Sequence, residues 1–208
     1  FILSFSFSFD MVSNKAFELL NINGQKTEII FEAPDIKIEK DEEGFSKFIT
    51  DDMIGTTMED NFPELPIHSS MFQMTPGMEY DIEYEVLSSY LIEDINFKSL
   101  DNNQNSIYPN DNISLSEPLI MRGLVLGQIS FIPYKYSFEN KTLEVYEAVQ
   151  ITISESHNSE FNYFVPEKRS YIFEELYENF VINYTRSDRS EDYQIPSILY
   201  ICGGNSIN

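Results

Sequence analysis

The chain has 208 residues, and 13 Lys or Arg against 35 Asp or Glu give it a formal net charge of −22 at pH 7. A charge of this sign and size repels phosphate backbones, which excludes nucleic acid as an expected partner. With one cysteine and two histidines, the chain has no internal disulfide framework, and we expect no metal site and no cofactor. No apolar run is long enough for a transmembrane helix.

The first ten residues alternate Phe with Ser after an apolar start. This pattern is typical of a strand, and it also fits the end of the apolar region of a secretory signal peptide. We therefore expect residues 1–10 to be either a leading strand or a signal-peptide remnant.

Residues 11–95 contain short apolar and alternating runs that are separated by turn residues. Asn23-Gly24 and the acidic turn at 41–44 predict hairpin tips, the second joining residues 36–40 to 45–50. Calcium binding at the acidic turn is disfavoured, since the EF-hand spacing is absent. Residues 80–86 alternate apolar and acidic side chains, which is typical of a half-buried strand.

The pattern fades between residues 98 and 118, where Tyr108 and Pro109 lie among Asn, Asp and Ser. A loop of about twenty residues is uncommon inside a compact domain and is usually functional or disordered. We therefore predict one long loop here, with a functional role as one alternative.

Three consecutive strands are predicted next, over 124–132, 135–138 and 143–153. The third places Leu143, Val145, Val149, Ile151 and Ile153 on one face and polar residues on the other. Its alternation slips at 146–148, which predicts a β-bulge.

The spacing changes at residue 170, where apolar residues recur at helical intervals up to 181 with Glu between them. Ser170 is the expected N-cap. A charged linker with Arg186 and Arg189 follows. The continuous apolar run at 195–202 is typical of a strand buried in a parallel sheet, so it predicts the start of a new α/β domain.

The fold class expected from these patterns is all-β. We expect an antiparallel β-sandwich over 11–168, a helix and linker over 169–194, and the first strand of a truncated α/β domain over 195–208.

Several of these stretches together resemble a known family. Residues 61–66 (NFPELP) look like its G-x-P-x-L-P segment, with Asn for the first Gly, and 121–136 look like its R-G, strand and P-x-x-Y. Residues 143–153 resemble the next strand, and 177–184 with 196–204 resemble the junction that follows. In this order they are similar to the N-terminal propeptide of gingipain-type (family C25) cysteine peptidases, followed by the first strand of the caspase-like catalytic domain.

The resemblance implies a β-sandwich prodomain that assists folding of its own downstream peptidase and blocks the active site until it is cleaved off. It also implies secretion to the exterior or cell surface of a bacterium. The chain itself is then non-catalytic, and Cys202 is a buried thiol of the first strand, because the family's catalytic Cys and His lie well downstream. The alternative is a non-catalytic extracellular binding or adhesion β-sandwich, with 195–208 as one more strand.

Candidate site residues follow from the loops and the linker. Arg122 is an inhibitory candidate, since the family blocks the peptidase cleft with a loop from this region, although Arg-Gly before a strand also fits an ordinary turn. The 98–118 loop with Tyr108 and Pro109 is the second inhibitory candidate. Arg186 and Arg189 are processing candidates because nicking concentrates in exposed linkers, and Arg169 is the alternative. No hydrolase, metalloprotease or nucleotide-binding motif is present.

Overall fold

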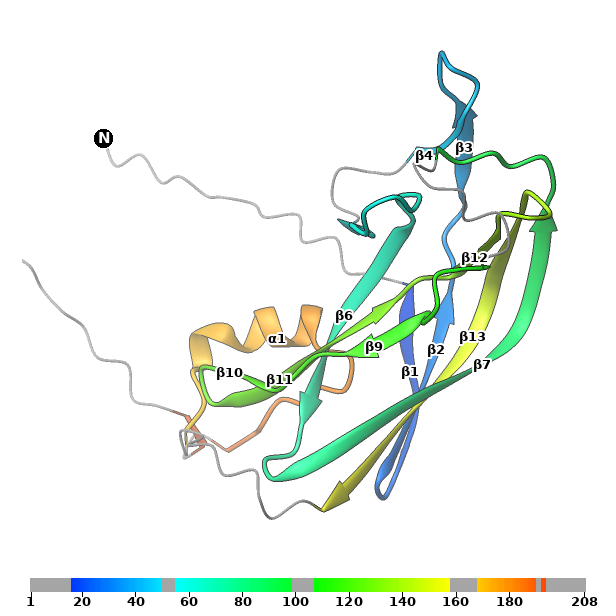
Figure 1. Cartoon of the computed structure of the whole chain (residues 1–208). Coiled ribbons are helices and arrows are strands. Elements are labelled where there is room, and N and C mark those ends of the chain that lie inside the picture. The colour runs from blue at the N-terminus through cyan, green and yellow to red at the C-terminus, as the bar shows by residue number, and fades with distance from the viewer. Residues whose placement is uncertain (1–15, 50–54, 99–106, 158–167, 190–191, 194–208) are drawn as a thin grey trace, which may run out of the picture.

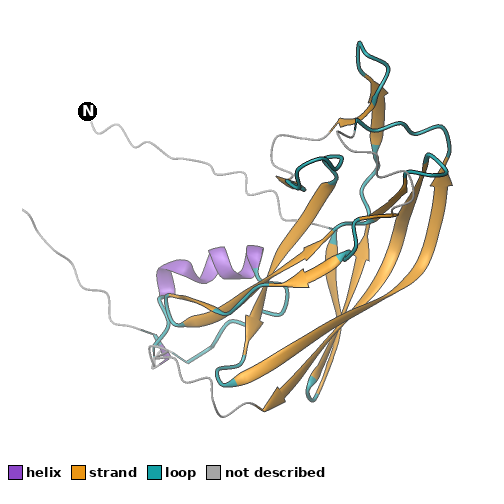
Figure 2. Ribbon diagram, in the orientation of Figure 1, coloured by secondary structure: helices purple, strands orange, loops and turns teal. Residues whose placement is uncertain are grey.

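The computed structural model describes residues 16–49, 55–98, 107–157, 168–189 and 192–193. Strands dominate these ranges, and one short helix follows them near the C-terminal end (Figures 1 and 2). The expected all-β class with one C-terminal helix is therefore confirmed. The predictions for residues 1–10 and 195–208, Cys202 included, lie outside the described residues.

The first sheet is built around β13 (Thr142–His157). β7 (Met78–Ile92) runs antiparallel along one side of it for the full length of the pairing. β2 and β12 divide the other side of β13 between them. The remaining strands of this sheet extend outward from these two, with bounds β1 (Phe17–Asn23), β2 (Lys26–Glu32), β8 (Ile107–Tyr108) and β12 (Tyr134–Ser137).

The second sheet has β6 (Pro66–Met74) and β11 (Leu124–Phe131) at its centre, paired antiparallel. β10 and β9 share the other side of β11, and β5 pairs with the start of β6. The bounds of these three strands are β5 (Gly55–Thr56), β9 (Ile113–Leu115) and β10 (Leu119–Met121). A separate hairpin of β3 (Lys37–Lys40) and β4 (Ser46–Ile49) projects at one end, as the acidic turn predicted (Figure 1).

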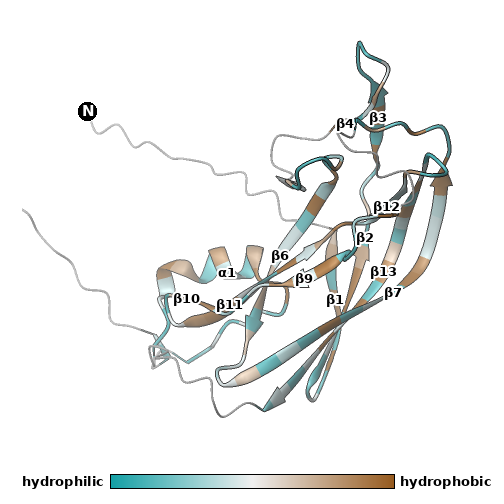
Figure 3. Cartoon of the chain, viewed as in Figure 1, coloured by the Kyte–Doolittle hydropathy of each residue, from teal (hydrophilic) through white to brown (hydrophobic). Residues whose placement is uncertain are grey.

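The main core lies between the two sheets, and its members come from alternate positions of the strands. Figure 3 shows the resulting alternation of hydrophilic and hydrophobic residues along the strands. Phe31 of β2 is fully buried, and its ring lies 4.9 Å from that of Phe131 of β11. Val149, Ile151 and Ile153 are buried on the same side of β13, as predicted. Burial of such side chains contributes about 1.5–3 kcal/mol each, so this interface holds the two sheets together.

The predicted β-bulge in β13 is confirmed by register shifts against β7 between Tyr146 and Val149. The extra residue on β13 (Tyr146 to Ala148 against Ser89 to Ser88) is offset at once by an extra residue on β7 (Ala148 to Val149 against Ser88 to Val86), so the alternation keeps the same face on both sides. Leu143 and Val145 therefore remain buried beside Tyr134 and Tyr136 in a second cluster at the other end of the sheet.

A helical segment covers the outer face of the second sheet (Figure 1). It consists of a 3₁₀ turn, η1 (Tyr171–Phe173), and α1 (Glu174–Phe180). Tyr177 and Val181 pack on Leu124 and Leu126, whose side chains point away from the main core. β11 is thus buried on both faces, which explains its continuous apolar run. No helix in the described part of the chain has the length and apolarity that crossing a membrane requires.

Two expectations about local structure are wrong. The Ser170 side chain makes no cap hydrogen bond, because the chain enters α1 through η1 rather than directly. The 98–118 segment is not one loop, since β8 and β9 lie within it. Between them the buried Asn112 donates from Nδ2 to the carbonyls of Ile132 and Tyr134. These strands have only two and three residues, too few for an alternation that sequence could reveal.

Candidate functional site

The turn between β10 and β11 presents Arg122 at the end of the second sheet. Met121 pairs with Leu124, so Arg122 and Gly123 form a two-residue hairpin loop. Their φ angles are +48° and +97°, as a type I′ turn requires, and this turn matches the twist of the flanking strands. A Cβ on Gly123 would lie 2.9 Å from the carbonyl oxygen of Lys168, so glycine is required twice over. The turn thus fixes the direction in which the Arg122 side chain leaves the backbone.

The helical segment braces this turn from the side. The hydroxyl of Tyr177 donates to the carbonyl of Met121 at 3.1 Å. The guanidinium of Arg122 lies 5.4 Å from the centre of the Phe173 ring, a cation–π arrangement, while the residue remains exposed. Arg122 is therefore both accessible and held in place, as a side chain that enters a partner's pocket must be.

The other predicted inhibitory residues are placed differently. Tyr108 is 2% exposed, its ring stacks 4.6 Å from that of Phe62, and Pro109 follows a cis peptide bond and is also buried. Tyr108 belongs to the second core cluster, and Pro109 is buried next to it in the chain. The exposed neighbours on this segment are Ile107, Asn110 and Asp111. A masking role for the loop remains a prediction.

Glu174, at the start of α1, is a buried carboxylate with 2% exposure. Its Oε2 accepts a hydrogen bond of 2.6 Å from the hydroxyl of Tyr184. Burial, together with this bond and the nearby charge of Glu174, raises the pKa of Tyr184. Burial also raises the pKa of Tyr177 and of Tyr193, and the charge of Glu174 adds to both shifts. The carboxylate is therefore surrounded by tyrosines that stay protonated at neutral pH.

Arg169 lies beside this cluster and is half-buried. Its Nη1 donates to the carbonyl of Thr185 at 3.3 Å and approaches the Tyr184 hydroxyl at 3.5 Å. Its backbone N–H donates to the carbonyl of Asp192, and the residue forms an isolated parallel bridge with Tyr193. Arg169 is thus tied into the fold at both its backbone and its side chain.

Arg186 and Arg189 are exposed on the segment after α1, but their surroundings differ. The guanidinium of Arg186 lies 5.2 Å from the centre of the Tyr171 ring, and its Nη1 lies 3.8 Å from Glu178 Oε1. The side chain of Arg189 makes no ion pair or ring contact within the described ranges. The structure therefore brings Arg122 and Arg186 to the helical segment and ties Arg169 to the residues that follow it.

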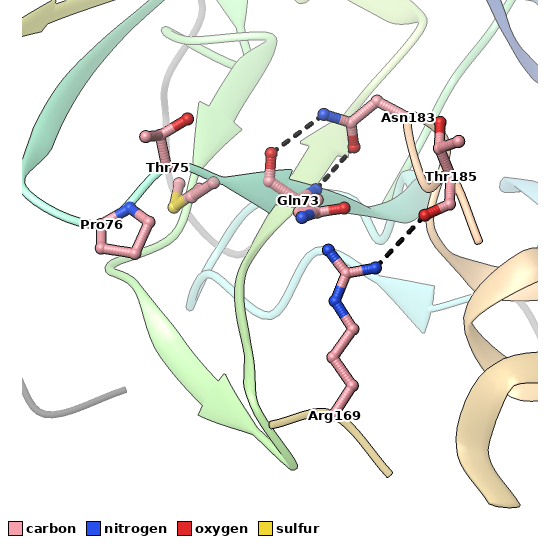
Figure 4. Close-up of a pocket in the computed structure, with 7 residues that line it drawn as sticks. Gln73, Thr75, Pro76, Arg169, Asn183 and Thr185 are labelled. Carbon is pink, nitrogen blue, oxygen red and sulfur yellow. Dashed lines mark hydrogen bonds between the residues drawn. The ribbon is translucent and has the colours of Figure 1, made fainter. Parts of the chain in front are cut away.

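A cleft of about 410 Å³ opens between the end of β6 and the segment after α1 (Figure 4). Asn183 closes one wall by accepting from the Gln73 N–H at 2.6 Å and donating to the Gln73 carbonyl at 2.9 Å. Arg169 supplies a positive charge, and the other lining residues are Met74, Thr75, Pro76 and Thr185. The described lining residues include no carboxylate, thiol or imidazole that could act as a general acid or base. Among the described residues no cluster of His, Cys, Asp or Glu could hold a metal ion.

Sequence reasoning missed Glu174, Asn183 and Tyr184. Residues 174, 177 and 181 share one helix face, and this spacing could have indicated that Glu174 points inward with Tyr177 and Val181. No local pattern pairs Asn183 with a strand that lies 110 positions earlier.

Solved structures share this architecture. The chain is similar to a structure from the complex of Porphyromonas gingivalis RgpB pro- and mature domains, with TM-score 0.62 and 20% identity over 83% of this chain and 100% of that one. It is also similar to a structure that gives insight into the zymogenic latency of gingipain K from Porphyromonas gingivalis, with TM-score 0.50 and 13% identity over 67% of this chain and 92% of that one. At these identities the likeness establishes the fold. No curated protein matches the chain.

The two-sheet fold with its helical C-terminal layer is the fold of a gingipain-type prodomain. A family model described as Propeptide_C25 matches residues 75–191, which is more than half of the chain. The chain therefore belongs to the C25 propeptide family.

Proposed function

We propose that this chain is the inhibitory and chaperone-like propeptide of a secreted, gingipain-like cysteine endopeptidase. It would cover the active site of its own peptidase until the connection between them is cut. Membership of the propeptide family supports this role. The RgpB structure contains both a pro- and a mature domain, and the gingipain K structure concerns zymogenic latency, which supports an intramolecular peptidase partner.

The observation that carries the proposal is the presentation of Arg122. It stands on a two-residue turn whose backbone angles are fixed, and Phe173 holds its guanidinium without burying it. A preorganised side chain loses little conformational entropy when it enters a pocket, so more of the contact energy appears as affinity. Arg122 is therefore our choice for the residue that occupies the substrate pocket.

Covalent attachment explains how such a masking domain can later leave. While the two domains share one chain, the effective concentration of the inhibitor is on the order of millimolar, so even modest contacts keep the site closed. After the connection is cut, the same contacts act between separate molecules and the domain dissociates on dilution. Arg186, Arg189 and Arg169 are the proposed processing positions.

Inhibition by the purified chain tests this proposal. The 208-residue chain is titrated into the mature peptidase of the same precursor, and hydrolysis of fluorogenic peptides with Arg or Lys at the cleaved position is followed. We expect saturable inhibition by the wild type. Arg122→Ala should weaken it about tenfold or more, because an arginine anchored at the centre of an interface contributes on that scale.

Arg189→Ala is the matched control, since it removes an exposed arginine side chain that makes no ion pair or ring contact among the described residues, and it should inhibit like the wild type. Equal inhibition by Arg122→Ala and wild type would remove Arg122 from the pocket. A reading frame that ends soon after Asn208, or continues as further sandwich strands, would favour the alternative binding or adhesion module.

A further inference from the structure

We propose that the Arg186–Ser187 peptide bond is a latent cleavage site, which the folded chain keeps closed to arginine-specific peptidases. The residues on both sides of this bond belong to a segment that we call the strap, residues 181–189, which packs on α1 and β6. This inference concerns the regulation of the processing step and takes its biological meaning from the proposed function. The protection of the Arg186–Ser187 bond depends only on contacts within this chain.

The side chain of Arg186 is already engaged. An arginine-specific peptidase must take this side chain into its own pocket, so the guanidinium has to leave the Tyr171 ring and Glu178. Each of these contacts is exposed to solvent and therefore individually weak. They therefore disfavour the extended arginine that a peptidase requires, without preventing it.

The residue after the bond is held more firmly. The Ser187 carbonyl accepts a hydrogen bond of 2.9 Å from the Tyr193 hydroxyl. The Ser187 hydroxyl bonds to a carboxylate oxygen of Asp192 and accepts from the Arg189 N–H at 3.3 Å. These bonds curl the backbone after Arg186 back on itself. A segment bound along an enzyme cleft has to be extended, so all of them must open before cleavage.

The residues before the bond anchor the strap to both neighbouring elements. Tyr184 is bonded to the buried Glu174 of α1, and Asn183 makes two bonds to Gln73 of β6. The Ile182 N–H donates to the Met71 carbonyl, so the strap also adds main-chain pairing to the edge of β6. Local opening of this segment therefore disrupts several contacts at once, and proteolysis in this regime follows the population of the open form.

Arg189 provides an internal reference, because its side chain is exposed and makes no ion pair or ring contact among the described residues. Its main chain shares part of the same network, since its N–H bonds to the Ser187 hydroxyl and its carbonyl accepts from the Asp192 N–H at 3.2 Å. The comparison therefore mainly reports the contacts of the Arg186 side chain and the anchors at residues 182–184. A peptidase that cuts after arginine meets both positions in the same molecule, so the ratio of the two rates cancels enzyme concentration and activity. We expect the folded chain to be cut after Arg189 at least tenfold faster than after Arg186.

Limited digestion of the full chain by trypsin, with products identified by mass, measures this ratio. Tyr193→Phe combined with Glu178→Gln should raise cleavage after Arg186 about tenfold relative to cleavage after Arg189. Tyr193 is 8% exposed, but the change to Phe removes only its hydroxyl and keeps the ring against Tyr171, and Glu178 is exposed, so circular dichroism should show an unchanged fold. Glu175→Gln is the matched control, since Glu175 is an exposed acid of the same helix without a side-chain contact to the strap, and it should leave the ratio unchanged.

Cleavage of the wild type after Arg186 as fast as after Arg189 would overturn the proposal. So would a double variant with an unchanged ratio. The trypsin experiment needs no cognate peptidase, so its failure leaves the inhibition assay intact, and failure of that assay leaves the closed bond intact.

Discussion

Asn183 pairs with Gln73 as a strand residue would, although it does so through its side-chain amide. The amide oxygen accepts from the Gln73 N–H and the amide nitrogen donates to the Gln73 carbonyl, so both main-chain groups of an edge residue are satisfied. The pair joins β6 to the segment after α1, which otherwise meets the sheet through Val181 and Ile182. The pair thus adds a polar tether to the apolar contact through which the helical layer docks.

Asn183→Ala should loosen this layer. It removes both bonds and leaves a partly buried N–H and carbonyl of β6 to water or to no partner, a loss of about 1–3 kcal/mol. We expect faster hydrogen exchange at the amides of residues 181–184 and a lower urea midpoint. Asn179→Ala is the control, because that side chain bonds to an exposed helix carbonyl, and it should change the midpoint by less than half as much. Unchanged exchange at 181–184 would show that the amide pair is dispensable.

The stability of the fold should decrease as the pH is lowered, because His68 is buried. This residue is 4% exposed against the ring of Phe31, and burial lowers its pKa from 6.5 to about 4. The unfolded chain therefore binds this proton first, so the contribution of His68 is complete above pH 6.5 and is lost as the pH falls toward 4. Between pH 7 and pH 5 the free energy of unfolding should drop by about 2 kcal/mol from this residue alone.

Chemical denaturation of wild type and His68→Phe at both pH values measures that drop. The variant should lose most of the pH dependence whatever its absolute stability. His157→Gln, at the exposed end of β13, should keep the wild-type slope. Equal slopes for wild type and His68→Phe would assign the pH dependence to other groups.

Gly123→Ala should destabilise the chain more than Gly44→Ala does. Both glycines have positive φ, at +97° and +87°, so both substitutions incur a backbone strain of about 1 kcal/mol. A Cβ at position 44 meets open space, whereas at position 123 it meets the Lys168 carbonyl at 2.9 Å. We expect an additional loss of about 1–2 kcal/mol at 123, measured as the difference in urea midpoints. Equal losses would mean that the segment at Lys168 yields freely.

Tyr184→Phe should cost about 1–3 kcal/mol, because it leaves the Glu174 carboxylate buried without its donor. Glu174→Gln should restore part of this loss in the double variant, since a neutral amide is less costly to bury than a charge. A double-mutant cycle from thermal unfolding gives the coupling energy. Additive losses would indicate that the hydroxyl and the carboxylate act independently.

The regular strands and turns could be predicted from the sequence, because alternation and turn chemistry are local. The alternation over residues 143–153 predicted which face of β13 points into the core, and the acidic turn at 41–44 predicted the hairpin of β3 and β4. The approach of Arg122 and Arg186 to the helical segment could not be predicted in this way. It depends on where η1 and α1 dock on the second sheet, and that docking is set by Leu124, Leu126, Tyr177 and Val181, which are distant in sequence. The burial of Glu174 could not be predicted either, because it also depends on how α1 docks.

The docking of α1 on β11 also has a temporal consequence for a chain made from its N-terminus. Leu124 and Leu126 are synthesised well before Tyr177 and Val181. A sandwich that folds early therefore exposes an apolar surface on β11 until α1 has been synthesised. Binding by chaperones, or pairing with a neighbouring nascent chain, would compete for that face during the interval. The outer layer is therefore completed at the same time as the segment that holds the proposed processing positions Arg186 and Arg189 emerges.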